Sequence, residues 1–319
     1  MRNRFNRWLL PLFLVTSINA NHPLFGQSAP DSPQPSSSLT FRSRVSEVRL
    51  VFFAADQNGH PVENLQKDDF AVVDDERMIR GFRSLTRSHL IKLDVMVLMD
   101  SSESVLPRFP EEMTDVLQLI SQSPWGSGDS VSLLSFSGME ARLTCARNCR
   151  KAFRADQVAS MPKGGATPLF DAVESATALL VERRQPDVWP VIVLFSDGDD
   201  TISKASFRQA LEKALTSEVE IYSVNVSKPG RLSNGYAALQ TIADQSGGRL
   251  VQMSQGASRI FNDVIEDLHS AYIVTYVPPA SSSEFNSLRI LPTHNLKLQF
   301  RCRRGYYRDL VGAQSEDRP

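Results

Sequence analysis

The chain contains 319 residues, of which 41% are hydrophobic and 22% are charged, and its formal net charge at pH 7 is -1. This length can supply one large domain and a small one. A net charge near zero gives no reason to expect a nucleic-acid or acidic-membrane partner, and no apolar run reaches the roughly 18 residues that cross a bilayer.

The N-terminus has the pattern of a secretory signal peptide. Three arginines precede the short apolar run from Trp8 to Val15, and small and polar residues follow as far as Ala20. A basic segment, a short apolar segment and small residues at the cleavage point define such a peptide. We therefore expect a signal peptide over residues 1–20, cleaved after Ala20 or after Gln27, and an exported protein that is periplasmic or secreted. The alternative is a buried N-terminal helix.

Two further segments are expected to lie outside packed structure. Residues 21–43 are rich in serine and proline, and we interpret them as a linker. Residues 311–319 are expected to form a disordered tail.

Two separated regions predict a small β domain. Residues 44–89 contain short apolar runs and the dipeptide Asn58-Gly59, a strong turn signal between strands. About forty such residues are too few for a self-sufficient β domain. Residues 271–310 include Leu296–Arg303, in which apolar and polar side chains alternate as in a half-buried antiparallel strand. We predict that the two regions combine into one β domain, with the central domain inserted between them.

The central region, residues 90–270, alternates apolar strands with amphipathic helices. This alternation predicts an α/β fold with a Rossmann-like, doubly wound and mostly parallel sheet. Strands are expected at Leu93–Met99, Ser130–Phe136, Val191–Phe195, Val219–Val226 and Arg249–Met253. Helices are expected at Glu111–Gln122, Pro168–Glu182, Lys204–Thr216, Ala237–Gln245 and Arg259–His269.

The cysteines fit an oxidising compartment. Cys145 and Cys149 lie four residues apart in a polar segment, where a local disulfide would close a loop. A zinc site would need more Cys or His nearby, and the five histidines are scattered along the chain. Cys302 lies on the alternating strand and is expected to be a buried small hydrophobic residue.

The first candidate site follows the apolar strand Leu93–Met99, which ends in Asp100, Ser102 and Ser104. A near-continuous apolar run is typical of a parallel strand buried on both faces, and open α/β sheets bind ligands at the carboxyl ends of such strands. One carboxylate and two hydroxyls are hard oxygen donors that suit divalent cations. Asp and Ser are also ordinary turn residues, so this motif alone decides little.

A second apolar strand ends in Asp197, followed by Gly198, Asp199 and Asp200. If the two strands are neighbours, Asp100 and Asp197 face the same crevice. In the alternative reading, Asp197-Gly198 is a turn and the following acidic pair is an N-terminal cap of the next helix.

A third segment, Pro162–Ala172, contains two glycines, which permit unusual backbone conformations, and a threonine that carries a hydroxyl. Gly164 and Gly165 permit close backbone approach, Thr167 is expected to cap a helix, and Pro168 is expected at its first position. A cap on a loop at the carboxyl edge of the sheet also directs a hydroxyl into the crevice.

Together, the five residues resemble the metal-ion-dependent adhesion site of the von Willebrand factor type A domain. The five are Asp100, Ser102 and Ser104 in Asp-x-Ser-x-Ser, Thr167 in Gly-Gly-x-Thr-Pro, and Asp197 in Ser-Asp-Gly. The resemblance covers residues 90–270 and implies a Rossmann-like sheet, helices on both faces and a divalent cation at one edge. It implies that the two serines bind the cation directly and the other three bind it directly or through water. The flanking β segments also resemble those of exported bacterial proteins with related domains.

The resemblance and the hard oxygen donors predict Mg²⁺ as the cofactor, with Mn²⁺ or Ca²⁺ as alternatives. Few direct carboxylates would leave the cation electrophilic, so the predicted partner is another protein that presents an Asp or Glu. Glu103 departs from the family pattern, because many members have Gly at this position. The departure concerns fine geometry and partner preference; the ligand set is complete.

Two other functions compete with metal-dependent protein binding. A metal-dependent hydrolase or phosphatase would use the same carboxylates, and a metal-free scaffold would not use them at all. Catalysis needs a nucleophile, a general base or a second metal. No histidine lies within the three motifs, and the chain has no GxSxG elbow, P-loop or HExxH sequence. We therefore predict a binding protein and not an enzyme.

Overall fold

The computed structural model of the chain describes residues 47–122, 125–152, 157, 161–227, 234–253, 257–280 and 283–307. The signal peptide, linker and tail predicted at 1–20, 21–43 and 311–319 lie outside the described residues, and the predicted domain boundaries stay predictions. Within the described ranges, none of the helices is both long and apolar enough to cross a membrane.

A six-stranded sheet forms the central domain and confirms the predicted α/β fold. Its strand order is β10-β9-β8-β5-β6-β7, and all neighbours are parallel except β6 and β7. The strands are β5 (Lys92–Asp100), β6 (Ser130–Ser137), β7 (Glu140–Cys145), β8 (Val188–Ser196), β9 (Glu220–Asn225) and β10 (Leu250–Gln252). The antiparallel edge strand β7 is additional to the prediction, because its mostly exposed residues carry no apolar pattern.

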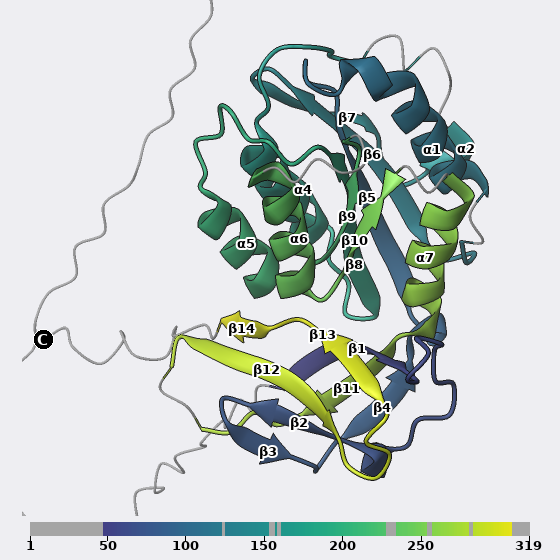
Figure 1. The fold of residues 1–319 in the computed structure, drawn as a ribbon, viewed down its shortest axis with the longest axis vertical. Coiled ribbons are helices and arrows are strands. Elements are labelled where there is room, and N and C mark those ends of the chain that lie inside the picture. Colours follow the sequence, from purple (N-terminus) through teal and green to yellow (C-terminus); the bar gives the residue numbers. More distant parts are fainter. Residues whose placement is uncertain are drawn as a thin grey trace, which may run out of the picture. The chain divides into compact units, whose positions relative to one another are not determined.

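Helices cover both faces of this sheet because its central strands are apolar on both faces. On β5, Val95 and Val97 belong to one core cluster while Met96 and Leu98 belong to another, and all four are fully buried. Figure 1 shows α1, α2 and α7 on one face and α4, α5 and α6 on the other. These helices are α1 (Phe109–Gln122), α2 (Cys149–Ala152), α4 (Leu169–Glu182), α5 (Phe207–Thr216), α6 (Asn234–Ser246) and α7 (Ala257–Ser270). Each predicted helix of the central region has its counterpart here.

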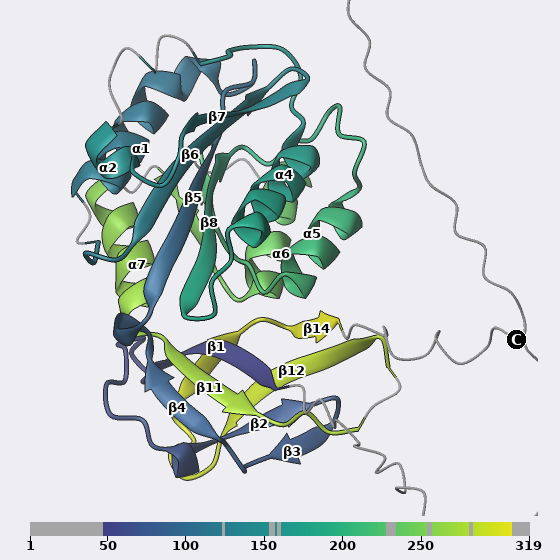
Figure 2. The ribbon, with the colours of Figure 1, turned by 180° about the vertical axis from the view of Figure 1, so that it is seen from behind.

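Strands from the two flanking regions combine into one β domain, as predicted, and its two sheets form a β sandwich (Figure 2). One four-stranded sheet has the order β13-β1-β11-β4 and the other β14-β12-β2-β3, with antiparallel neighbours throughout. The strands are β1 (Val48–Ala55), β2 (Phe70–Asp74), β3 (Arg77–Ile79), β4 (Ser84–Arg87), β11 (Tyr272–Tyr276), β12 (Phe285–Pro292), β13 (Gln299–Cys302) and β14 (Gly305–Tyr307). The two sheets share an apolar core, in which the rings of Phe52 and Phe70 lie 4.9 Å apart.

The turn predicted at Asn58-Gly59 is present, but a strand does not follow it. The amide of Gly59 donates to the carbonyl of Asp56 at 3.0 Å, and Gly59 has the positive φ of +85° that favours glycine. The chain then rejoins β1 only through an isolated bridge between Ala55 and Pro61. Proline has no amide hydrogen to donate, so it does not extend a ladder.

The predicted alternating strand at Leu296–Arg303 is partly wrong. The strand β13 begins only at Gln299, and Leu296 is 77% exposed. Only part of the polar face of this strand lies in solvent: Gln299 is exposed, whereas Arg301 and Arg303 pack against the amino edge of the central sheet. Arg301 pairs there with Asp267 of α7, and Arg303, which is 7% exposed, pairs with Glu218.

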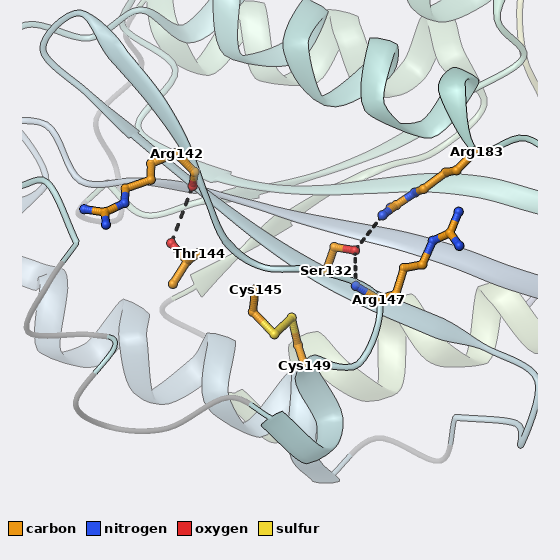
Figure 3. Close-up of a disulfide and its surroundings, with 7 residues drawn as sticks. All are labelled: Ser132, Arg142, Thr144, Cys145, Arg147, Cys149 and Arg183. Carbon is orange, nitrogen blue, oxygen red and sulfur yellow. Dashed lines mark hydrogen bonds between the residues drawn. A yellow bond between two sulfur atoms is a disulfide. The ribbon is translucent and has the colours of Figure 1, made fainter. Parts of the chain in front are cut away.

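The structure joins Cys145 and Cys149 in a disulfide that links the end of β7 to α2 (Figure 3). Arg147 lies in the turn between them with φ +55°, and its amide donates to the hydroxyl of Ser132 on β6 at 2.9 Å. The disulfide therefore closes a turn that is also tied to the sheet. Cys302 is buried as predicted, and burial raises the pKa of its thiol to about 12.

Candidate metal centre

Adjacent parallel strands bring the first and second motifs together. Met99 of β5 is in register with Phe195 of β8, so both strands end at the same edge of the sheet. Asp100 is fully buried there. One of its oxygens accepts a hydrogen bond from the Ser196 hydroxyl at 2.7 Å, and the other accepts from the Ser102 amide at 2.9 Å. The Asp100 carboxylate is thus fixed between the ends of the two strands.

The charge of Asp100 lacks compensation by a basic side chain among its main neighbours. Burial raises the pKa of Asp100 to about 6, and the nearby carboxylate of Asp197 adds to the increase. Hydrogen bonds from Ser102 and Ser196 oppose this increase but do not cancel it. A cation at this edge would stabilise the ionised form of Asp100.

The two serines of the first motif converge on the same turn. Ser102 is fully buried and Ser104 is exposed. Their hydroxyl oxygens lie 3.4 Å apart. One carboxylate and two hydroxyls therefore meet within five consecutive residues, as the sequence predicts.

The Gly-Gly loop lies against this turn, as the predicted close backbone approach requires. Gly164 and Gly165 have φ values of +82° and +78°, which disfavour other residues. The amide of Gly164 donates to the carbonyl of Ser101 at 2.7 Å, and the amide of Glu103 donates to the carbonyl of Gly165 at 3.0 Å. A Cβ added at Gly164 would lie 3.0 Å from a carboxylate oxygen of Glu103. The exposed Glu103 side chain therefore lies over the glycine loop.

The predicted capping role of Thr167 is wrong. Helix α4 begins at Leu169, its N-cap is Pro168, and no side chain of the cap residue bonds to the helix. Ser203 and Asp200 accept hydrogen bonds from the first amides of the helix instead. Thr167 is 3% exposed, and among the described residues its hydroxyl has no recorded hydrogen bond, although its amide and carbonyl bond to the 201–202 turn. Its hydroxyl is therefore available for another role.

The acidic run after β8 is divided between two functions. Asp197 is partly buried, and it accepts a hydrogen bond from the Asp199 amide at 3.2 Å. Asp199 accepts from the Gly235 amide in the first turn of α6 at 3.1 Å, while Asp200 serves the first turn of α4. The next helix in the chain, α5, is capped by Ser206. Asp199 and Asp200 thus accept hydrogen bonds from the first turns of α6 and α4. The alternative reading expected them to cap the next helix, α5, and that expectation is wrong.

Two residues at this edge are missed by the sequence reasoning. Ser196 bonds to Asp100 and also accepts from the Gly198 amide at 2.9 Å, and its position just before Asp197 was a usable signal. Glu112 on α1 is fully buried, and its electrostatic neighbours include Asp100 and Asp197. The signal for Glu112 was an acidic residue at an apolar position of an amphipathic helix.

The donor set fits a hard divalent cation. Two carboxylates and three hydroxyls come from the residues named in the three motifs: Asp100, Ser102, Ser104, Thr167 and Asp197. The described residues contain no group of three or more His, Cys, Asp or Glu side chains placed to hold a metal. A cation here would therefore depend on hydroxyls as well as carboxylates, which suits Mg²⁺ and its retained waters better than zinc or copper.

The chain matches known proteins over its central domain. A family model for the von Willebrand factor type A domain matches residues 94–266. The 60 kDa subunit of magnesium chelatase from Cereibacter sphaeroides is 31% identical over 118 residues, which are 36% of this chain. That match covers 21% of the subunit, so the chain spans about a fifth of this relative's length.

Several solved structures are similar to the chain at low sequence identity. Proximal thread matrix protein 1 from the mussel byssus is 16% identical with a TM-score of 0.46, over 61% of this chain and 50% of that one. A zinc-occupied form of that protein is 17% identical with a TM-score of 0.45, and the match covers 60% of this chain and 50% of that one. An aerotolerance-related membrane protein from Bacteroides fragilis is 16% identical with a TM-score of 0.38, and the match covers 55% of this chain and 98% of that one. Because the family model spans more than half of the sequence, the chain belongs to the von Willebrand factor type A domain family.

Proposed function

We propose that this protein is a metal-dependent protein-binding module that uses the carboxyl edge of its central sheet. One observation carries the proposal. Asp100 is fully buried beside a second carboxylate and two serine hydroxyls, and its hydrogen-bond partners are neutral. A buried carboxylate without a positive partner is costly, and a bound cation offsets that cost.

Asp100, Ser102, Ser104, Thr167 and Asp197 would hold the ion, with Mg²⁺ as the first candidate and Mn²⁺ or Ca²⁺ as alternatives. When bound, the ion would supply an electrophilic centre that accepts an Asp or Glu oxygen from a partner protein. The chain's own residues set the conditions: Ser196 fixes Asp100, and the Gly164–Gly165 loop fixes the serine turn. Membership of a family whose domains mediate protein binding supports the same assignment.

We also propose that the protein is exported and works in the periplasm or outside the cell. The signal-peptide pattern at residues 1–20 supports this location. The disulfide between Cys145 and Cys149 is consistent with it, since disulfides persist in oxidising compartments.

The test is a pull-down from native envelope and secreted proteins with the full chain, with Mg²⁺ or with EDTA. We expect specific partners that bind with Mg²⁺, are released by EDTA and do not bind Asp100→Ala. A matched control is Glu140→Ala, which removes an exposed carboxylate on β7 and should bind as the wild type does. Partners that are retained in EDTA would instead favour a metal-free scaffold. Turnover of phosphate or ester substrates that disappears in Asp100→Ala would favour the hydrolase.

A further inference from the structure

Glu112 occupies a core position of helix α1. The buried stripe of this helix runs through Phe109, Met113, Val116 and Ile120, and Glu112 lies on the same side, three residues after Phe109. Apolar residues normally fill such positions, and acidic residues are almost never fully buried unless they are paired. Glu112 is 0% exposed. Its burial therefore needs an explanation beyond packing.

Within the part of the chain that the structure describes, the carboxylate of Glu112 has no hydrogen-bond partner. Both of its oxygens are inaccessible to solvent and neither forms a hydrogen bond in the described structure. Burial, and then the charges of Asp100 and Asp197, raise the pKa of Glu112 well above its ordinary value. Its strongest charged neighbours are thus the two carboxylates of the candidate metal centre.

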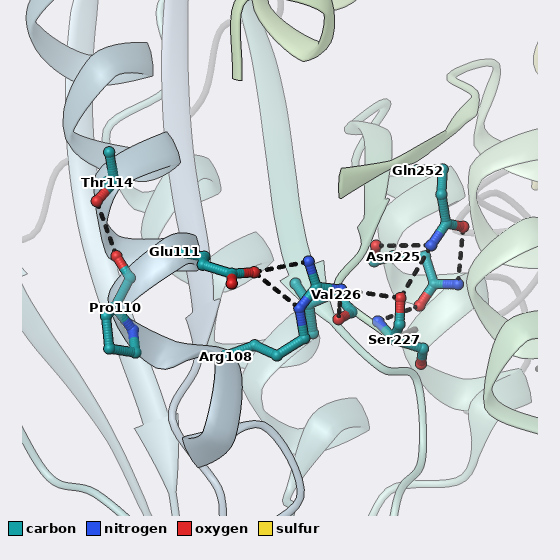
Figure 4. A network of polar contacts seen from close by, with 8 residues as sticks. All are labelled: Arg108, Pro110, Glu111, Thr114, Asn225, Val226, Ser227 and Gln252. Atoms are coloured by element: carbon teal, nitrogen blue, oxygen red, sulfur yellow. Dashed lines mark hydrogen bonds and ion pairs between the residues drawn. The ribbon is translucent and has the colours of Figure 1, made fainter. Parts of the chain in front are cut away.

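The basic residue nearest in the chain, Arg108, is committed elsewhere (Figure 4). It forms an ion pair with Glu111 at 2.9 Å, and it donates to the carbonyls of Val226 and Ser227 at 2.7 Å and 3.0 Å. Arg108 lowers the pKa of Glu112 less than Asp100 and Asp197 raise it. Among its main charged neighbours the two carboxylates therefore outweigh Arg108.

We propose that Glu112 is a sixth residue of the cation site, in addition to the two carboxylates and three hydroxyls. It acts from helix α1 through its charge and its free acceptor oxygens. This inference rests on the proposed cation site. Glu112 is a positioning residue and not a direct ligand, because the described residues contain no three carboxylates close enough to hold one ion together. A hydrated Mg²⁺ keeps several waters that need hydrogen-bond acceptors, and outer carboxylates commonly supply them.

A structural role and a cation-directed role predict opposite results for Glu112→Gln. If the carboxylate only supports packing, the substitution lowers stability and leaves cation affinity unchanged. If it serves the cation, the substitution weakens Mg²⁺ binding by about 10- to 100-fold, the usual loss for an outer-shell partner. In EDTA the same variant should melt no lower than the wild type, because a neutral amide replaces a buried group whose ionisation burial and the neighbouring carboxylates oppose.

The experiment is calorimetric titration of the EDTA-treated full chain with Mg²⁺, together with thermal melting in EDTA. Glu111→Gln is the matched control, since it makes the same change one residue away on a side chain that is 66% exposed. Wild-type affinity in Glu112→Gln, with binding intact in the wild type, overturns this inference alone. Absence of Mg²⁺ binding in the wild type overturns the cation site and the inference together. If Glu112→Gln does not fold, Glu112→Met is measured, and failure of both to fold overturns the inference in favour of a structural role.

Discussion

The two edges of the central sheet treat their carboxylates in opposite ways. At the carboxyl edge, Asp100, Asp197 and Glu112 act on one another with no fully compensating basic group. At the amino edge, Glu218 and Asp267 lie in a group of arginines. Asp267 pairs with Arg249 at 2.9 Å and Arg301 at 2.5 Å.

The difference is visible in the pKa values. Burial acts to raise the pKa of Glu218, but Arg303 and Arg184 outweigh it and hold the pKa below its ordinary value. Burial raises the pKa of Asp100 to about 6, and no arginine offsets it. Arginines thus balance the charges of Glu218 and Asp267 at the amino edge, although burial still raises the pKa of Glu220 there. At the carboxyl edge we propose that a bound cation supplies the balance, and we therefore place function there and a structural role at the other edge.

Of the substitutions that test this difference between the edges, removal of the Asp100 side chain should have the largest effect on cation binding. In Asp100→Ala the Mg²⁺-induced rise in melting temperature should disappear and Mg²⁺ affinity should fall by at least about 100-fold, because the central carboxylate is lost. Thermal melts with Mg²⁺ and with EDTA measure this. Glu140→Ala should retain the full response, and a retained response in Asp100→Ala would contradict the proposed ligand set.

Breaking the amino edge should cost stability and leave metal binding intact. Asp267→Asn leaves Arg301 and Arg249 without their shared carboxylate, and we expect the free energy of unfolding to fall by about 2 kcal/mol, since the three side chains are partly exposed. Urea denaturation in EDTA measures the change. Glu266→Gln, an exposed neighbour on α7, should change it little. A loss of Mg²⁺ affinity in Asp267→Asn would show that the two edges are not independent.

Substitutions of Thr167 test whether its hydroxyl, which does not cap helix α4, is needed for cation binding. Thr167→Ala should lower Mg²⁺ affinity by about tenfold, the size expected for one lost polar interaction of about 1.4 kcal/mol. Thr167→Ser keeps the hydroxyl and should retain the affinity. Stability in EDTA should change little, because the bonds of Thr167 to the 201–202 turn use its backbone. Equal affinities for the Ala variant and the wild type would remove Thr167 from the site.

The last expected effect, about 1 kcal/mol over any one pH unit, is a pH dependence at the amino edge. Burial raises the pKa of Glu220 to about 8, against the opposing charge of Arg301. Because its pKa is higher in the folded than in the unfolded state, Glu220 costs stability as pH rises between its unfolded value and about 8. Relative to the wild type, Glu220→Gln should therefore gain about 1 kcal/mol per pH unit through that window. Chemical denaturation at a series of pH values checks this, and a pH-independent difference would contradict it.

Much of the fold could be predicted because apolar periodicity records burial. The parallel strands β5 and β8 are continuous apolar runs that are buried on both faces. Strand β7 escaped prediction because it is a mostly exposed edge strand. The polar face of β13 was misjudged because Arg301 and Arg303 form ion pairs with residues more than 30 positions away in the chain, which alternation alone does not reveal.

Some residues of the candidate site could likewise be predicted from the sequence and others could not. The residues that end strands, Asp100 and Asp197, could be placed because parallel strands end at one edge. Thr167 was placed at that edge too, but with the wrong local role, since Ser203 and Asp200 from another segment serve the helix start. Glu112 was missed because it lies on a helix outside the three motifs, and only tertiary packing brings it near the two carboxylates.

Isothermal titration of the EDTA-treated full chain with Mg²⁺ is the most direct test of the carboxyl-edge cation site. We expect saturable binding of one Mg²⁺ per chain that is abolished in Asp100→Ala and unchanged in Asp267→Asn. No binding of Mg²⁺, Mn²⁺ or Ca²⁺ to the wild type, or equal binding to Asp100→Ala, would contradict the assignment of this edge as a metal centre.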